Sequence, residues 1–108
     1  MSDIKLSKDA TKVLCTIYKE YLSRIKQGVP KPNAIIFEIR DITRLFPNID
    51  ISIETSELSN NSLINQWING EFELSQSGII YMENRVGDTI DKIVDFISKL
   101  KPWLFHIL

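Results

Sequence analysis

The sequence predicts a single α+β domain, and three observations lead to that class. Near the N-terminus, apolar residues recur at helical spacing. In the middle, Asn69-Gly70 stands between two short runs typical of a β-hairpin. Towards the C-terminus, apolar residues recur every three or four positions, as along a helix that packs on another helix. The chain has 108 residues, 44% of them hydrophobic, which suits one domain (1–108) with its own core.

The first predicted helix begins after Ser7, a favourable N-cap residue, and ends before Gly28 and Pro30. One face of this helix is apolar and is expected to pack on the core. This stripe consists of Ala10, Val13, Leu14, Ile17, Tyr18, Tyr21, Leu22 and Ile25.

A second helix is predicted over residues 34–46, with Asn33 as its cap and Pro47 as its end. Residues 34–39 are rich in Ile and Phe, which favour strands, so a strand there is an open alternative. A short third helix is predicted over residues 52–61. Ser, Thr and Asn in this stretch favour caps and turns, and Ile51 and Ile53 alternate as in a strand, so this helix is expected mainly because a hairpin follows it.

The hairpin is predicted to turn at Asn69-Gly70 in a two-residue type I′ turn, because both positions of that turn need a positive φ. Pairing outward from this turn sets Trp67 opposite Phe72 and Asn65 opposite Leu74. One face would then carry Leu63, Trp67, Phe72 and Leu74, and the other would carry Gln66, Glu71 and Glu73.

Two further helices are predicted after the hairpin. The fourth helix covers residues 76–85 and is capped by Ser75. A fifth, amphipathic helix covers residues 88–101 and is followed by an apolar tail, 102–108. Residues spaced alternately four and three apart form a heptad seam on this last part: Val86, Ile90, Ile93, Ile97, Leu100 and Leu104.

The order of helices and hairpin, with Leu74-Ser75-Gln76-Ser77-Gly78 leading out of the hairpin, resembles that of winged-helix proteins. More narrowly, residues 63–100 resemble the small phage-associated YjcQ-like group, in which a hairpin runs into an L-[ST]-x-x-G segment and a helix with a tyrosine, here Tyr81. The resemblance implies a winged helix, with three helices plus a two-stranded wing and additional C-terminal helices. It also implies a DNA-binding or transcription-regulatory role in a phage or prophage.

The charge distribution runs against the usual use of that fold. DNA-binding proteins draw much of their affinity from Lys and Arg contacts to phosphates. Residues 45–84, which cover the expected reading helix and the whole hairpin, contain six acidic residues and no Lys or Arg. Residues 1–32 hold seven basic residues against three acidic ones. Glu71 and Glu73, beside the turn, would face phosphates directly.

Two functions therefore stay open. In the first, the protein binds double-stranded DNA through its basic first helix and uncharged residues of the third. The candidate contacts are Lys8, Lys12, Lys19, Ser56, Ser59, Asn60 and Asn61. In the second, it is a protein-interaction or dimerisation module that does not bind DNA, and the seam from Val86 to Leu104 forms a homodimer. The same seam could instead pack on the first helix of its own chain.

An enzyme is not expected. Cys15 and His106 are the only residues of their kinds, so no zinc-type set can be assembled, and the four glycines are isolated, so no phosphate-binding loop is present. No cofactor, metal or small-molecule substrate is therefore expected. The sequence has no secretory signal and no apolar run near the ~20 residues that span a membrane, which favours a cytoplasmic protein.

Overall fold

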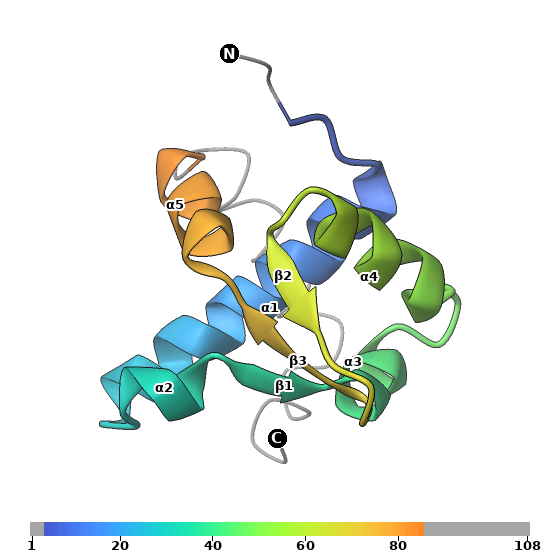
Figure 1. The fold of residues 1–108 in the computed structure, drawn as a ribbon. Coiled ribbons are helices and arrows are strands. Elements are labelled where there is room, and N and C mark those ends of the chain that lie inside the picture. Colours follow the sequence, from blue (N-terminus) through green and yellow to red (C-terminus); the bar gives the residue numbers. More distant parts are fainter. Residues whose placement is uncertain (1–3, 86–108) are drawn as a thin grey trace.

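The computed structural model describes residues 4–85 and, within that range, contains five helices and one three-stranded antiparallel sheet (Figure 1). In chain order the elements are α1 (Lys8–Lys26), α2 (Lys31–Ala34), β1 (Ile36–Glu38), α3 (Ile39–Leu45), α4 (Ile51–Asn60), β2 (Ile64–Gln66), β3 (Glu71–Leu74) and α5 (Gln76–Asn84). The strands lie in the order β1-β3-β2. The predicted α+β class is confirmed, and the expected two-stranded hairpin is part of a three-stranded sheet because β1 pairs with β3.

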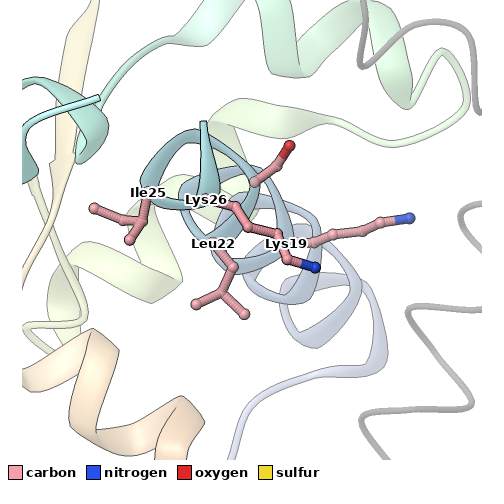
Figure 2. Close-up of a pocket in the computed structure, with 5 residues that line it drawn as sticks. Lys19, Leu22, Ile25 and Lys26 are labelled. Atoms are coloured by element: carbon pink, nitrogen blue, oxygen red, sulfur yellow. The ribbon is translucent and has the colours of Figure 1, made fainter. Parts of the chain in front are cut away.

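Helix α1 follows the predicted stripe. Ser7 caps it, because the Ser7 Oγ accepts a hydrogen bond from the Ala10 N–H at 3.1 Å. The stripe is buried from Ala10 to Tyr21, while its last two members, Leu22 and Ile25, remain partly exposed (Figure 2).

The predicted helix over residues 34–46 is wrong in its first part. Ile36–Glu38 form the strand β1, and only the later part of the predicted range is a longer helix, α3. The strand that the sequence left as an alternative is therefore present. The reason is tertiary pairing. Phe37 lies opposite Phe72 in the β1–β3 ladder, and the two rings stack in the core with their centroids 5.6 Å apart.

The third predicted helix is confirmed as α4, which begins one residue earlier than expected. Asp50 caps its start, since the Asp50 Oδ1 accepts the Ser52 N–H at 3.1 Å. Asn61 closes its other end by donating from its side-chain amide to the carbonyl oxygen of Glu57 at 2.9 Å. Pro47 lies between α3 and α4, where the sequence predicts a stop.

The predicted hairpin exists, but its turn and its register are wrong. The Trp67 N–H donates to the Glu71 carbonyl at 2.9 Å, which leaves the three-residue loop 68–70 in place of a two-residue turn. Gly70 has a φ of +86°, whereas Asn69 does not have a positive φ, so the turn is not type I′.

The extra loop residue shifts every partner by one position. Gln66, not Trp67, lies opposite Phe72, and Ile64, not Asn65, lies opposite Leu74. Ile64, Phe72 and Leu74 are buried together, whereas Trp67 is 43% exposed. The observed register pairs two apolar side chains where the predicted one paired Asn65 with a leucine, and burial of an apolar face fixes the register of a strand.

The passage from β3 into α5 explains the Leu-Ser-x-x-Gly motif. The Ser75 Oγ accepts the Gly78 N–H at 2.9 Å and donates to the Ser62 carbonyl at 2.6 Å. A side chain at Gly78 would collide with the carbonyl oxygen of Leu63. The predicted cap and the predicted fourth helix are therefore confirmed, and the glycine is needed for close approach of α5 to the start of β2.

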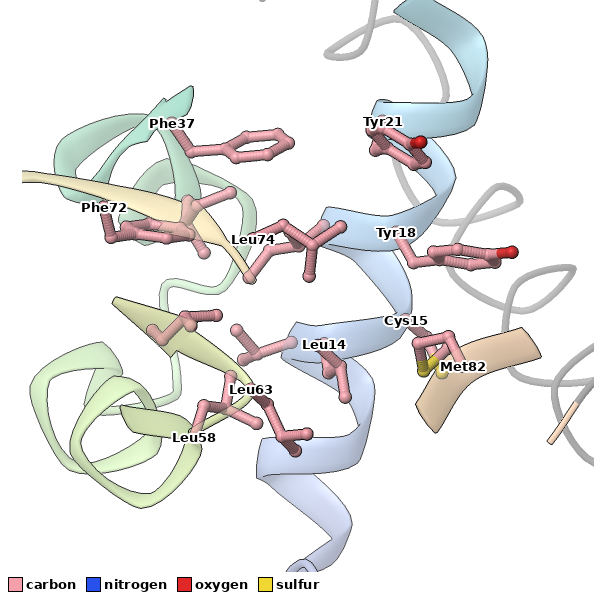
Figure 3. Packing of buried hydrophobic residues seen from close by; sticks show 14 of the residues in the cluster. Leu14, Cys15, Tyr18, Tyr21, Phe37, Leu58, Leu63, Phe72, Leu74 and Met82 are labelled. Atoms are coloured by element: carbon pink, nitrogen blue, oxygen red, sulfur yellow. The ribbon is translucent and has the colours of Figure 1, made fainter. Parts of the chain in front are cut away.

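One hydrophobic cluster joins α1 to the sheet and to helices α4 and α5 (Figure 3). Leu14 of α1 lies on the side of Leu58 and Leu63, and Cys15 lies against Met82 of α5. The predicted helix over 88–101, the tail 102–108 and the seam from Val86 to Leu104 lie outside the described residues.

Candidate nucleic-acid interface

Helices α3 and α4 and the loop of the hairpin lie on one side of the molecule (Figure 1). The two helices contact each other and are joined by residues 46–50. The hairpin loop is tied to the start of α3 by a hydrogen bond from the Ile39 N–H to the Gly70 carbonyl, 3.0 Å long. Two helices joined by a short turn are a common DNA-binding arrangement, in which the second helix enters the major groove and the first crosses the backbone.

Two basic side chains on this side come from α3. Arg40 and Arg44 are four residues apart, so they lie on the same helix face. Their side chains are 71% and 64% exposed. Each has an acidic neighbour, Glu38 at 3.4 Å and Asp41 at 3.7 Å, but ion pairs this exposed are weak. These two arginines are not among the contacts expected from the sequence, although their spacing in a predicted helix is a usable signal.

Helix α4 presents a mostly uncharged surface. Ser56 and Asn60, both candidate contacts, are exposed, and so is Ile53. Ser59 and Asn61 are only partly exposed. The Asn61 amide donates one of its N–H groups to a backbone carbonyl at the end of α4, so this side chain has a role in closing the helix.

The structure does not gather the three candidate lysines of α1. Lys8 is exposed at the start of α1, next to α4, because the neighbouring Ser7 N–H donates to Glu57 Oε2 at 2.7 Å. Lys19 lies eleven residues further along, which is about 17 Å at 1.5 Å per residue. Lys12 lies between them and is partly buried. Of the three, only Lys8 lies beside the second helix of the pair.

Carboxylates set the local electrostatics of α4. Burial raises the pKa of Glu54 above its ordinary value, and the Ser7 hydroxyl, 3.3 Å from its Oε1, acts in the opposite direction. The same hydroxyl lies 3.0 Å from Glu57 Oε1. Hydrogen bonds from Ser52 lower the pKa of Asp50 at the helix start. These carboxylates would repel a phosphate placed near this part of α4.

The hairpin is also acidic, and its tip is apolar. The Glu73 carboxylate accepts from the Asn65 amide at 2.9 Å, and the Glu71 carboxylate accepts from the Asn69 amide at 3.1 Å. Ile68, at the tip of the loop, is fully exposed. With the half-exposed Trp67 beside it, this tip is suited to contact an apolar surface.

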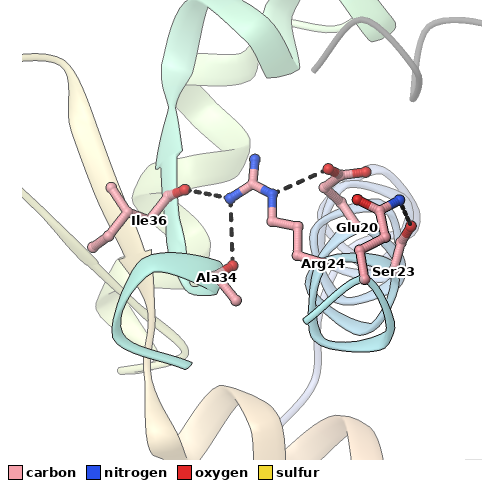
Figure 4. A network of polar contacts seen from close by, with 6 residues as sticks. Glu20, Ser23, Arg24, Ala34 and Ile36 are labelled. Atoms are coloured by element: carbon pink, nitrogen blue, oxygen red, sulfur yellow. Dashed lines mark hydrogen bonds and ion pairs between the residues drawn. The ribbon is translucent and has the colours of Figure 1, made fainter. Parts of the chain in front are cut away.

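Arg24 of α1 has a structural role (Figure 4). Its Nη1 donates to the carbonyls of Ile36 at 2.6 Å and Ala34 at 3.4 Å, and its Nε donates to Glu20 Oε2 at 3.0 Å. Its guanidinium also lies 4.3 Å from the ring centroid of Phe37. Arg24 therefore holds the end of α1 to the outer edge of β1, and it is not available to a phosphate.

Other kinds of site find little support in residues 4–85. No group of three or more His, Cys, Asp or Glu in this range could hold a metal ion. Burial raises the pKa of the Cys15 thiol to about 11, so the thiol is protonated at neutral pH and is a poor nucleophile. No helix in the same range is both long enough and apolar enough to cross a membrane.

No family model, curated protein or solved structure matches this chain.

Proposed function

We propose that the protein is a winged helix of the phage-associated type and acts as a non-enzymatic DNA-binding regulator. The order of elements supports this: a helix, a one-turn helix, a short strand, two helices joined by a turn, and a hairpin, with the strands in the order β1-β3-β2. In this proposal α3 and α4 are the helix-turn-helix pair, and the β2–β3 hairpin is the wing. Membership of the YjcQ-like group is part of the same proposal and rests on the Leu74-Ser75-x-x-Gly78 motif and Tyr81.

The observation that carries the proposal is the pair of exposed arginines on α3. In a helix-turn-helix the first helix crosses the DNA backbone, and α3 is the helix that carries Arg40 and Arg44. A guanidinium can hold a phosphate with two parallel hydrogen bonds. This arrangement removes part of the conflict with the acidic hairpin, because the phosphate contacts come from the helix before the reading helix.

In this proposal α4 recognises the DNA bases. Ser56 and Asn60 can donate hydrogen bonds to base edges, and the exposed Ile53 can contact the methyl group of thymine. With Lys8 as the one candidate lysine beside α4, two or three phosphate contacts are expected. Each contact contributes about 0.9 to the slope of log K against log salt, so the expected slope is about −2 to −3.

The test is fluorescence anisotropy of a labelled DNA duplex, titrated with protein at several salt concentrations. The double variant Arg40→Ala/Arg44→Ala should reduce the salt slope by about 2 and weaken binding to every duplex. The matched control is Lys26→Ala/Lys31→Ala, which removes two exposed positive charges at the other end of α1 and in α2.

Equal losses of affinity and of salt slope in the two double variants would show that binding depends on net charge and not on α3. If wild-type protein fails to bind at tens of micromolar in low salt, the proposal is wrong, because non-specific affinities are typically about 10⁻⁴–10⁻⁶ M even at physiological salt.

A second candidate function, a protein-interaction module, is favoured by the exposed Trp67 and Ile68 on an acidic hairpin. Exposed apolar patches of this kind mark interaction sites. For a homodimer, this alternative predicts association in sedimentation velocity that Ile68→Ser abolishes and that Ile80→Ser, a change at a half-exposed isoleucine of α5, leaves intact. A protein that is monomeric at all concentrations would exclude the homodimer.

A further inference from the structure

Four residues of α1 form a straight apolar strip with coiled-coil spacing. Cys15, Tyr18, Leu22 and Ile25 are three, four and three residues apart, the spacing of a helix that packs lengthwise on another helix. Cys15 and Tyr18 are buried, whereas Leu22 is 46% and Ile25 is 39% exposed. The strip is thus buried along one half and open along the other.

The open half borders a hollow of about 500 Å³ (Figure 2). Its described lining comes from α1 alone: Lys19, Leu22, Ser23, Ile25 and Lys26. Figure 2 shows the side chains of Leu22 and Ile25 pointing away from the helix axis.

Helix α5 brings the chain to the buried half of the strip. Met82 of α5 lies against Cys15 (Figure 3). The charge of Arg85, the last described residue, also acts on the Cys15 thiol and opposes the effect of burial on its pKa. The chain therefore leaves the described range close to the middle of α1, next to the point where the strip becomes exposed.

We propose that the open half of the strip is the docking site of the protein's own segment 86–104. The sequence of this segment carries the complementary pattern, with apolar residues spaced four, three, four, three and four apart. Two helices with such seams pack knobs into holes. The same seam cannot at once cover α1 and form a dimer, so this docking replaces the homodimer seam that the sequence left open.

The segment is long enough for this role. The predicted helix over residues 88–101 would span about 21 Å, and the strip from Cys15 to Ile25 spans about 15 Å at 1.5 Å per residue. No long linker is needed, because Met82, three residues before Arg85, lies against Cys15 (Figure 3). The inference depends on α1 and α5 only and is independent of any DNA-binding activity.

The test is a double-mutant cycle in the full-length protein, measured by thermal unfolding. We expect Leu22→Ser and Ile97→Ser each to lower the Tm by roughly 5 °C. The double variant should lose little more than either single variant, because both changes remove the same contact. Ile53→Ser is the matched control, since Ile53 is an exposed isoleucine on α4 and its replacement should shift the Tm by much less.

Sedimentation velocity on the same samples shows whether the docking segment belongs to the same chain or to a second copy of the chain. The proposal requires a monomer and a Tm that does not depend on protein concentration. Additive losses in the double variant would overturn it, as would a Leu22→Ser variant no less stable than Ile53→Ser. A concentration-dependent Tm would assign the strip to a second copy of the chain and would overturn it too.

Discussion

Replacing Gly78 by alanine tests how α5 is joined to the sheet. In helix interiors alanine is usually favoured over glycine by about 1 kcal/mol. At this position the new Cβ would collide with the carbonyl oxygen of Leu63, which accepts the Ser75 N–H at 3.1 Å. That carbonyl belongs to backbone at the start of β2, so it cannot rotate away as a flexible side chain can.

Gly78→Ala should therefore lower the free energy of unfolding by about 1–3 kcal/mol. Overpacking of this kind costs typically 1–3 kcal/mol, and the disturbed hydrogen bonds of Ser75 add about 1 kcal/mol, which the better helix propensity of alanine offsets. At about 4–8 °C per kcal/mol, the Tm should fall by roughly 4–24 °C. Differential scanning calorimetry measures this directly, with Ser77→Ala at an exposed neighbouring position as control. If Gly78→Ala is neutral or stabilising, the close approach of α5 to β2 is not as described.

Two changes at α4 should show opposite pH dependence. Burial raises the pKa of Glu54. The contribution of this group to stability is therefore present at low pH and is lost as pH rises through its folded pKa. Glu54→Gln should stabilise the protein at about pH 7 and not at about pH 4. Hydrogen bonds from Ser52 lower the pKa of Asp50, so Asp50→Asn should destabilise the protein at about pH 7, and the difference should disappear as pH falls below the unfolded pKa of about 3.9. Chemical unfolding at about pH 7, at about pH 4 and at a lower pH, well below the unfolded pKa of Asp50, measures these changes. The same sign for both variants at about pH 7 would contradict this assignment of causes.

Local signals predicted α1 and α5 well. Ser7 and the stripe that follows it define α1, and Ser75 defines the start of α5, because a cap and a helical period depend only on nearby residues. Strand β1 lacks such a signal. It has three residues, too few to show an alternating apolar pattern. It forms because Phe37 pairs with Phe72, some 35 positions further along the chain.

The hairpin shows a second limit of the sequence. Asn69-Gly70 correctly marked the turn, but a loop of two residues and a loop of three are both compatible with it. Burial decides between the two loop lengths. The three-residue loop places Ile64 opposite Leu74 in the core, whereas the two-residue loop would place Asn65 there. Trp67 was consequently assigned to the wrong face.

The structure brings together only some of the candidate contacts. Ser56, Asn60 and Lys8 lie on or beside α4. Lys12 and Lys19 belong to other parts of α1, because a 19-residue helix spreads its charges over almost 30 Å. The arginines of α3 were not among the expected contacts, because the apolar periodicity that predicts a helix does not show which of its exposed charges bind a ligand.

Titration of the ¹⁵N-labelled protein with a short DNA duplex at low salt tests the central proposal most directly. If α3 and α4 bind DNA, the largest amide shift changes should fall around Arg40, Arg44 and residues 52–60. The exposed turn of α1 near Leu22 should not move. Changes confined to α1, or none at all at millimolar duplex, would contradict a DNA-binding role for the helix pair.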